Sequence, residues 1–166
     1  AEDEYMKLEK HLWVYFLNER AANFSNDRSY HIVATIFIEN QSNAWYRKLD
    51  IIEETIKYLL NFDAANHNTT RVAKRFKDLL NAQFERLNFA YRIINDEIVE
   101  ITSEQEIKTI ETAIDNSARN VKMHLNRALE LYAQRPDGDY RNSIKESISA
   151  VEAFCREKTG ENTLGK

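Results

Sequence analysis

Apolar residues along this chain recur mostly at intervals of three and four, the spacing that places side chains on one face of an α-helix. Polar stretches at residues 23–29 and 66–70, and the pair Asn116–Ser117, separate these runs. The pattern predicts helices over residues 4–21, 42–61, 71–87, 103–115, 118–135 and 139–160.

Two segments need further interpretation. Residues 30–38 carry many β-branched side chains, which favours a strand, but the neighbouring helices favour a buried helix, and we predict a helix there. In the helix over residues 71–87 we expect six residues to form the inner face: Val72, Phe76, Leu79, Leu80, Gln83 and Leu87.

Residues 88–101 change to a period of two, which is typical of strands. Asn95 and Asp96 lie between the two alternating runs and favour a two-residue turn. Two strands alone are only marginally stable, so we expect the hairpin to lie against helices. The predicted fold is mainly α, a bundle of about seven helices with one small β-hairpin at residues 88–101.

The last helix carries two different stripes. Asp139 is placed to cap its start and Gly160 to end it. Apolar residues recur at one helical spacing, and we expect them to form a buried seam: Ile144, Ile148, Val151 and Cys155. A polar stripe is turned away from that seam and consists of Asn142, Glu146, Ser149 and Glu152, with Arg141 and Lys145 close by.

Composition narrows the class of protein. The 166 residues are 43% apolar with 3 Gly and 1 Pro, which indicates long helices and short connections in a single domain over residues 1–166. One cysteine fits a reducing cytoplasm, and no apolar run approaches the 18 or so residues of a membrane span. The net charge of −4 argues against indiscriminate coating of nucleic acid, although a local basic patch can still bind it.

Two blocks of sequence resemble a known family. Residues 139–152, DYRNSIKESISAVE, followed by Thr163-Leu-Gly-Lys166, are similar to a helix of the AbiJ-type abortive-infection proteins. Residues 45–53, WYRKLDIIE, resemble the Trp…Asp-x-x-Glu helix of the same family. The resemblance runs from about Trp13 to the end of the chain. It implies an antiphage role linked to HEPN ribonucleases, a helical superfamily whose signature is Arg, four to six residues, then His.

The chain departs from that signature. Glu146 stands five residues after Arg141, and no histidine follows His124. The resemblance implies an Arg–His pair farther downstream, so we expect this domain to be cut off at its C-terminal end. It also implies that any metal-independent endoribonuclease activity belongs to the full-length protein.

Four residues at the start of the last helix are candidates for catalysis: Arg141, Asn142, Lys145 and Glu146. Arginine and lysine stabilise negative charge on a phosphorane, and a carboxylate can remove the proton of a 2′-hydroxyl. The alternative is an exposed helical turn whose charges pair with each other at a spacing of four.

Other charged groups have supporting roles in this hypothesis. Asp50 and Glu53, with Glu152, are candidates for orienting the basic groups, for instance through a buried ion pair of Glu53 with Arg141 or Lys145. The alternative for these acids is a solvated surface. Four basic residues at the start of the helix predicted over residues 71–87 either face RNA, face another copy of the protein, or are solvated: Arg71, Lys74, Arg75 and Lys77.

No metal or organic cofactor is expected. The four histidines have no partner at metal-ligand spacing, and no phosphate-binding glycine loop occurs. We assign His124 to the surface or to packing. The leading hypothesis is a recognition, regulatory or incomplete nuclease module of an antiphage HEPN-type ribonuclease system, with RNA, a second copy or a phage-derived trigger as partners. The alternatives are a non-catalytic dimerisation or partner-binding domain, and a complete ribonuclease that works without histidine.

Overall fold

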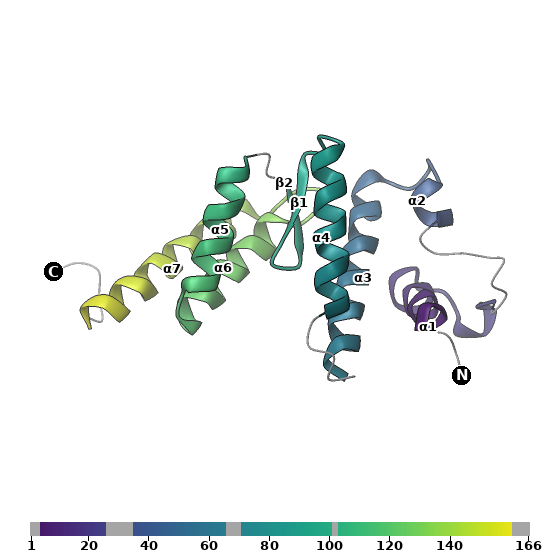
Figure 1. Cartoon of the computed structure of the whole chain (residues 1–166), viewed down its shortest axis with the longest axis horizontal. Coiled ribbons are helices and arrows are strands. Elements are labelled where there is room, and N and C mark those ends of the chain that lie inside the picture. The colour runs from purple at the N-terminus through teal and green to yellow at the C-terminus, as the bar shows by residue number, and fades with distance from the viewer. Residues whose placement is uncertain (1–3, 26–34, 66–70, 101–102, 161–166) are drawn as a thin grey trace. The chain divides into compact units, whose positions relative to one another are not determined.

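The computed structural model describes residues 4–25, 35–65, 71–100 and 103–160 (Figure 1). The chain divides into two compact units, Ala1–Leu80 and Asn81–Lys166, and the boundary falls within one helix. Within the described residues there are seven α-helices and one antiparallel pair of strands, which confirms the predicted mainly-α class. No helix in these ranges has both the length and the apolar character to span a membrane. The expectation of a single domain stays a prediction.

The first unit is built from four helices and short helical turns. The first predicted helix is shorter than expected, because it ends in a π-helical turn at Phe16 and Asn18 adopts a left-handed conformation with φ of 57°. The helix predicted over residues 30–38 lies largely outside the described residues, and its described end is helical. The four α-helices are α1 (Glu4–His11), α2 (Phe37–Glu39), α3 (Trp45–Ala65) and α4 (Arg71–Arg86).

The core of the first unit forms where α1 and the π-helical turn meet α3. Leu12 and Ile51 are each only 2% exposed. They pack with partly buried apolar side chains on both sides of the contact: Leu8, Trp13, Phe16, Leu17, Phe37 and Ile52. The long helix α3 is therefore the element on which the first helical segment of this unit packs.

The inner face predicted for α4 is wrong in part. The buried residues of this helix are Ala73 and Phe84, whereas four of the six expected inner residues are exposed: Val72, Leu79, Gln83 and Leu87. A buried carboxylate explains the orientation. Asp63 of α3 accepts hydrogen bonds from the backbone N–H groups of Val72 and Ala73, both at 3.0 Å, and so fixes which side of the first turn faces α3.

The hairpin is confirmed. Strands β1 (Tyr91–Ile94) and β2 (Glu97–Glu100) pair antiparallel, with Ile94 opposite Glu97. The turn residues Asn95 and Asp96 both have positive φ, as a two-residue hairpin turn requires. Asn81 of α4 covers the outer edge of β1, since its side chain both donates to the Ile93 carbonyl and accepts from the Ile93 N–H.

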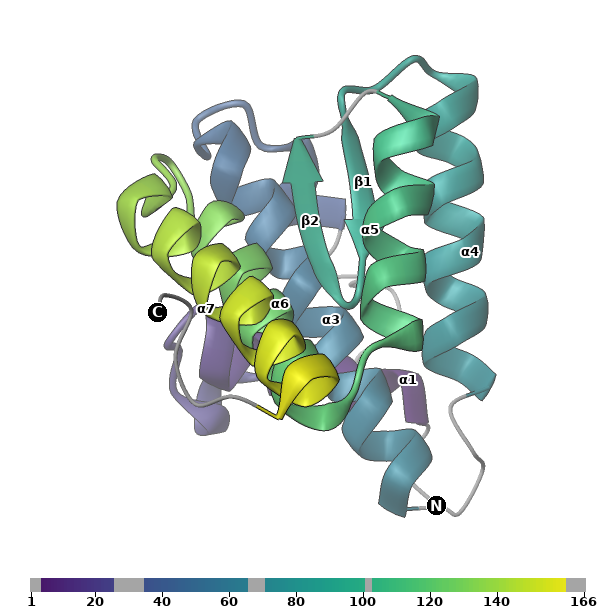
Figure 2. The ribbon, with the colours of Figure 1, turned by 90° about the vertical axis from the view of Figure 1, so that its left-hand side faces the viewer.

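Three helices complete the second unit: α5 (Glu104–Asn116), α6 (Arg119–Tyr132) and α7 (Tyr140–Thr159) (Figure 2). The caps predicted at Asp139 and Gly160 are both present, and Ser103 caps α5 by accepting a hydrogen bond from the Glu106 N–H. The core joins the hairpin to α5 and α6 through Ile94, Val99, Ile114, Leu129 and Ala133.

The buried seam predicted for α7 is wrong. Ile144, Ile148 and Val151 are each more than half exposed. The helix instead buries Ser143 and Ala150 against α6, and the Ser143 hydroxyl donates to the carbonyl of Ala128 at 2.8 Å. Small side chains allow two helices to approach closely, so the face of α7 that packs is the face with the smallest residues rather than the most apolar one.

Candidate functional site

The polar side of α7 begins with a helix cap. The Asp139 carboxylate accepts from the backbone N–H of Asn142 at 3.2 Å and from its side-chain amide at 2.7 Å. These bonds, the side-chain bond first, lower the pKa of Asp139, and the nearby charges of Arg141 and Arg127 act in the same direction. Asn142, a candidate for catalysis, therefore has a structural role as the partner of this cap.

Glu146 is bound to a histidine. Its Oε2 lies 2.7 Å from Nδ1 of His124 on α6, and both side chains are somewhat less than one-third exposed. A carboxylate on one ring nitrogen orients the imidazole and leaves Nε2 as the other functional atom. The sequence interpretation missed this pair because the two residues are 22 positions apart and meet only where α6 packs on α7.

Arg127 lies one helical turn beyond His124 on α6. Its guanidinium bonds to Glu130 at 2.8 Å, and this bond is the main reason that the pKa of Arg127 is raised. The charges of Glu146 and Asp139 raise it further, which places the arginine within electrostatic reach of both carboxylates. The α6–α7 edge thus combines a histidine, a carboxylate and an arginine.

The four predicted catalytic side chains do not converge. Arg141, Asn142 and Lys145 line a hollow along the outer side of α7, together with Ile144, Ile148, Ser149 and Glu152. Glu146 is not part of this lining, because it turns toward His124. Glu152 pairs instead with Arg156, one turn along, at 3.4 Å. The structure therefore brings three of the four candidates together and separates the fourth.

The predicted orienting acids lie in the first unit. Asp50 lies 3.6 Å from Arg47, and Glu53 is buried. An ion pair of Glu53 with Arg141 or Lys145 would join the two units, and it stays a prediction.

The predicted basic surface occupies the first two turns of α4. Arg71, Lys74 and Arg75 are exposed, whereas Lys77 is partly buried. Positive charge near a helix N-terminus opposes the helix dipole, so these residues do not stabilise α4. The Asp63 carboxylate, bonded to the first turn, supplies the favourable negative charge there.

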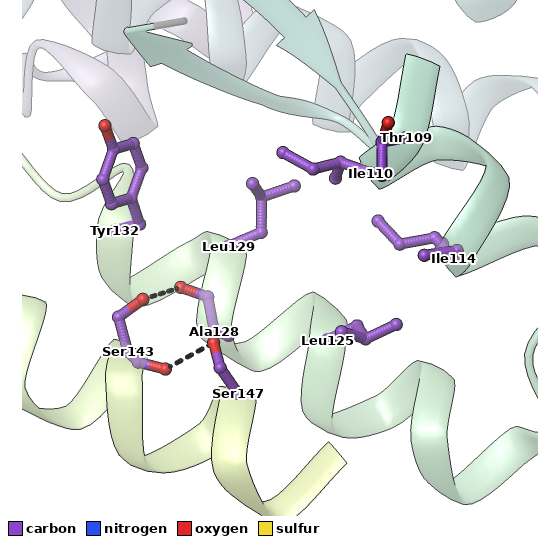
Figure 3. A pocket seen from close by; sticks show the side chains of 10 residues that line it. Thr109, Ile110, Ile114, Leu125, Ala128, Leu129, Tyr132, Ser143 and Ser147 are labelled. Atoms are coloured by element: carbon purple, nitrogen blue, oxygen red, sulfur yellow. Dashed lines mark hydrogen bonds between the residues drawn. The ribbon is translucent and has the colours of Figure 1, made fainter. Parts of the chain in front are cut away.

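An apolar pocket of about 280 Å³ opens between α5, α6 and α7 (Figure 3). Ile110, Leu125 and Leu129 form much of its wall. The hydroxyls of Ser143 and Ser147 at its α7 side already donate to backbone carbonyls. A second hollow shares Ala113 and Leu125 with this pocket, and the two together form an apolar groove between α5 and α7.

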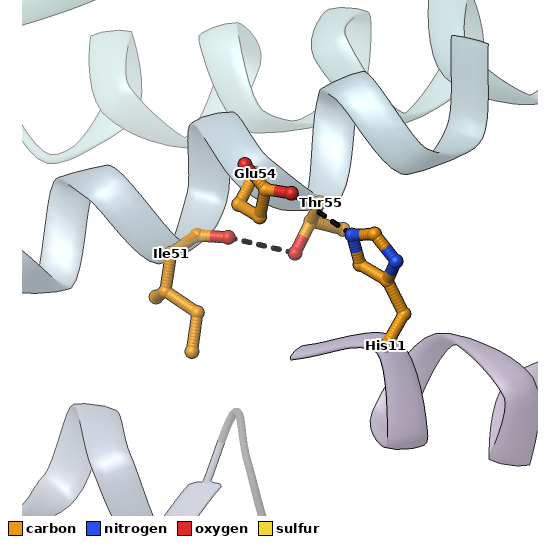
Figure 4. Close-up of polar contacts among 4 residues, drawn as sticks. All are labelled: His11, Ile51, Glu54 and Thr55. Atoms are coloured by element: carbon orange, nitrogen blue, oxygen red, sulfur yellow. Dashed lines mark hydrogen bonds and ion pairs between the residues drawn. The ribbon is translucent and has the colours of Figure 1, made fainter. Parts of the chain in front are cut away.

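The first unit contains a histidine–carboxylate pair of its own. His11 Nε2 lies 2.9 Å from Oε1 of Glu54, between α1 and α3 (Figure 4). The imidazole also contacts the rings of Tyr15 and Tyr58, with centroids 4.8 and 4.9 Å away. Since Tyr58 belongs to α3 and Tyr15 to the π-helical turn that follows α1, these contacts and the pair hold the two segments together. Nowhere in the described ranges do three or more His, Cys, Asp or Glu side chains gather as a metal ion would need.

Comparison with known proteins gives a family. The family model described as AbiJ N-terminal domain 4 matches residues 4–116, which include α1 to α5 and the hairpin. The candidate residues on α6 and α7 lie beyond the matched range. No curated protein and no solved structure matches the chain. Since the family model covers more than half of the sequence, the chain belongs to the AbiJ N-terminal domain 4 family of abortive-infection systems.

Proposed function

We propose that this chain is the recognition module of an abortive-infection system and that it works by binding protein through the outer face of α7. One observation carries the proposal. Four large apolar side chains on α7, those of Ile144, Ile148, Val151 and Phe154, are between 49% and 62% exposed. We call these four residues the α7 face.

Apolar surface of this kind is costly to leave in water. Burial contributes roughly 25 cal/mol per Å² of apolar area, so a helix that folds with its large side chains outward forgoes this stabilisation. Contiguous exposed apolar patches on soluble proteins mark interaction sites. The neighbouring apolar groove between α5 and α7 extends the patch, because Val151 and Phe154 line it.

The chemistry of the α7 face favours protein over RNA. Binding to nucleic acid depends mainly on positive groups that meet phosphates. Arg141 and Lys145 lie beside the α7 face, but the centre of the face is aliphatic and the acidic Glu152 lines the same hollow. The resemblance of this helix to HEPN-linked proteins supports a ribonuclease as the effector that the module serves, and a phage-derived protein or a second copy as what it binds.

The test is a substitution at the centre of the α7 face in the full-length protein. Ile148→Asp places a charge on a side chain that is 55% exposed, so the fold is retained and binding is lost. We expect antiphage protection, measured as plaque reduction, to disappear. Met123→Asp on α6 is the matched control, since Met123 is 59% exposed and lies outside the α7 face. Full protection by the Ile148 variant would refute the proposal.

A second candidate function is metal-independent RNA cleavage, favoured by the 2.7 Å contact of His124 with Glu146. In this proposal the imidazole removes the 2′-hydroxyl proton and the resulting oxygen attacks phosphorus to form a 2′,3′-cyclic phosphate. The bond from phosphorus to the 5′-oxygen breaks as that oxygen takes up a proton from water, and the imidazolium returns its proton to solvent. Arg127 is the neighbouring cation for the phosphorane charge. RNA cleavage by the isolated chain that His124→Gln abolishes would support this function, whereas our leading proposal expects no cleavage by the chain.

A further inference from the structure

Three residues of the α7 face, together with Cys155, have the spacing of a coiled-coil seam. Ile144, Ile148, Val151 and Cys155 are separated by four, three and four residues, the alternation of a and d positions in a heptad. The first three are more than half exposed, and Cys155 is partly buried. A seam with this spacing packs against another helix that carries the same spacing.

Charges along one flank of the seam change sign at its centre. Lys145 and Glu152 are seven residues apart and so occupy the same heptad position, one on each side of Ile148. Arg141 adds positive charge at the N-terminal end of the seam. Glu152 pairs with Arg156 only at 3.4 Å on an exposed surface, where such pairs contribute little. The carboxylate is therefore available to a stronger partner.

We propose that α7 pairs with α7 of a second copy of this chain, in antiparallel orientation about a two-fold axis midway between Ile148 and Val151. This inference rests on the proposed function and names the partner of the α7 face. The two-fold axis places Lys145 of one copy beside Glu152 of the other, and does so twice. Both orientations bring basic residues together at the ends of the seam: Arg141 meets Arg141 and Lys158 meets Lys158 in a parallel pair, and Arg141 meets Lys158 in an antiparallel one. Only the antiparallel pair places Lys145 beside Glu152, so these two contacts favour it.

The opposite flank supports the same arrangement. Ser147 and Phe154 are also seven residues apart, and the antiparallel pairing places Phe154 of one copy opposite Ser147 of the other. Ser147 is small and lines the pocket of about 280 Å³ between α5, α6 and α7. A large aromatic side chain thus faces a small one at the mouth of an apolar pocket, which is the shape complementarity that a packed interface requires.

The area of the α7 face determines how tightly the dimer should associate. Stable interfaces bury about 800 Å² on each partner, and one helix face supplies less than that. We therefore expect a reversible dimer with a dissociation constant in the micromolar range. Its two interchain ion pairs make it weaker at high salt, because salt screens exposed charges.

The test is sedimentation velocity of the 166-residue chain across the micromolar range. We expect a monomer–dimer equilibrium that Ile148→Asp abolishes and that Met123→Asp leaves unchanged. Lys145→Glu and Glu152→Lys should each weaken the dimer about tenfold, because each places like charges together twice. The double variant restores opposite charges, and its dissociation constant should return to within about threefold of the original. Circular dichroism verifies that each variant is folded.

Three outcomes overturn the inference, and they separate it from the proposed function. A chain that stays monomeric throughout, while Ile148→Asp still abolishes protection, shows that the α7 face binds a different protein, so only the second-copy partner fails. A double variant as weak as the single ones excludes the antiparallel pairing. If Ile148→Asp changes neither association nor protection, the proposed function fails together with the inference.

Discussion

Asp63 is the residue whose loss should disturb the first unit most clearly. It is 1% exposed, and one of its carboxylate oxygens accepts from two backbone N–H groups at the start of α4. No described residue donates to the other oxygen, Oδ1. The helix start is thus held by a side chain from α3, eight positions before Arg71. Replacing Asp63 with alanine removes the acceptor and leaves both N–H groups without it.

The expected cost follows from these bonds. A hydrogen bond to a charged group contributes about 1.5–3 kcal/mol, and the loss of a helix cap typically costs about 1 kcal/mol. Negative charge at the helix N-terminus adds about 0.3–1 kcal/mol. Burial of the charge, with one oxygen lacking a described donor, offsets part of this gain. We therefore expect Asp63→Ala to lower the free energy of unfolding by about 2–4 kcal/mol. Asp63→Asn keeps one acceptor and should cost about half as much.

The tryptophans make the measurement specific to this unit. Both tryptophans of the chain, Trp13 and Trp45, lie in the first unit, so their fluorescence during urea unfolding reports on it. With a slope of about 1 kcal/mol per molar urea, Asp63→Ala should lower the midpoint by roughly 2 M or more. Asp78→Ala on the exposed side of α4 is the control, and it should change the stability by no more than about 0.5 kcal/mol.

The reasoning would be refuted by a small effect. If Asp63→Ala moves the fluorescence midpoint no more than Asp78→Ala does, the buried carboxylate does not anchor α4. The orientation of that helix would then need another cause.

Three other predictions concern stability. In thermal melts, Ile148→Ala should lower the free energy of unfolding by no more than about 1 kcal/mol and Ile51→Ala by about 2–5 kcal/mol, because of these two residues only Ile51 is in the core. Equal losses would show that α7 buries its apolar stripe. Asn81→Ala should cost about 2–3 kcal/mol, since it leaves the N–H and C=O of buried Ile93 without their partner, and a loss below 0.5 kcal/mol in urea titration would contradict this. The pKa of Asp139 is lowered on folding, so its contribution is complete above the ordinary aspartate pKa and is lost as pH falls through the lower folded value. Asp139→Asn should therefore remove part of the decline in melting temperature on acidification, whereas an unchanged pH profile would count against the cap.

Local chemistry determined much of the secondary structure. The pair Asn95–Asp96 tolerates positive φ and therefore specifies the hairpin turn, whatever packs around it. Ser103 and Asp139 cap helices through bonds to residues three positions later, so their effect is also contained within one stretch of chain. Apolar periodicity located the helices for the same reason, because the helical repeat is a property of the backbone.

Only the tertiary structure decided which face of each helix is buried. The apolar stripe of α7 predicts a buried seam, but α6 offers a close approach at Ala128, and the small Ser143 and Ala150 fit there. The contact of His124 with Glu146 is a consequence of the same packing. Likewise, Asp63 fixes the orientation of α4 from another helix. The periodicity of the sequence indicates which face of a helix is apolar. Whether that face is buried depends on the shape and the hydrogen-bonding groups of the surface that packs against it, and that surface comes from distant parts of the chain.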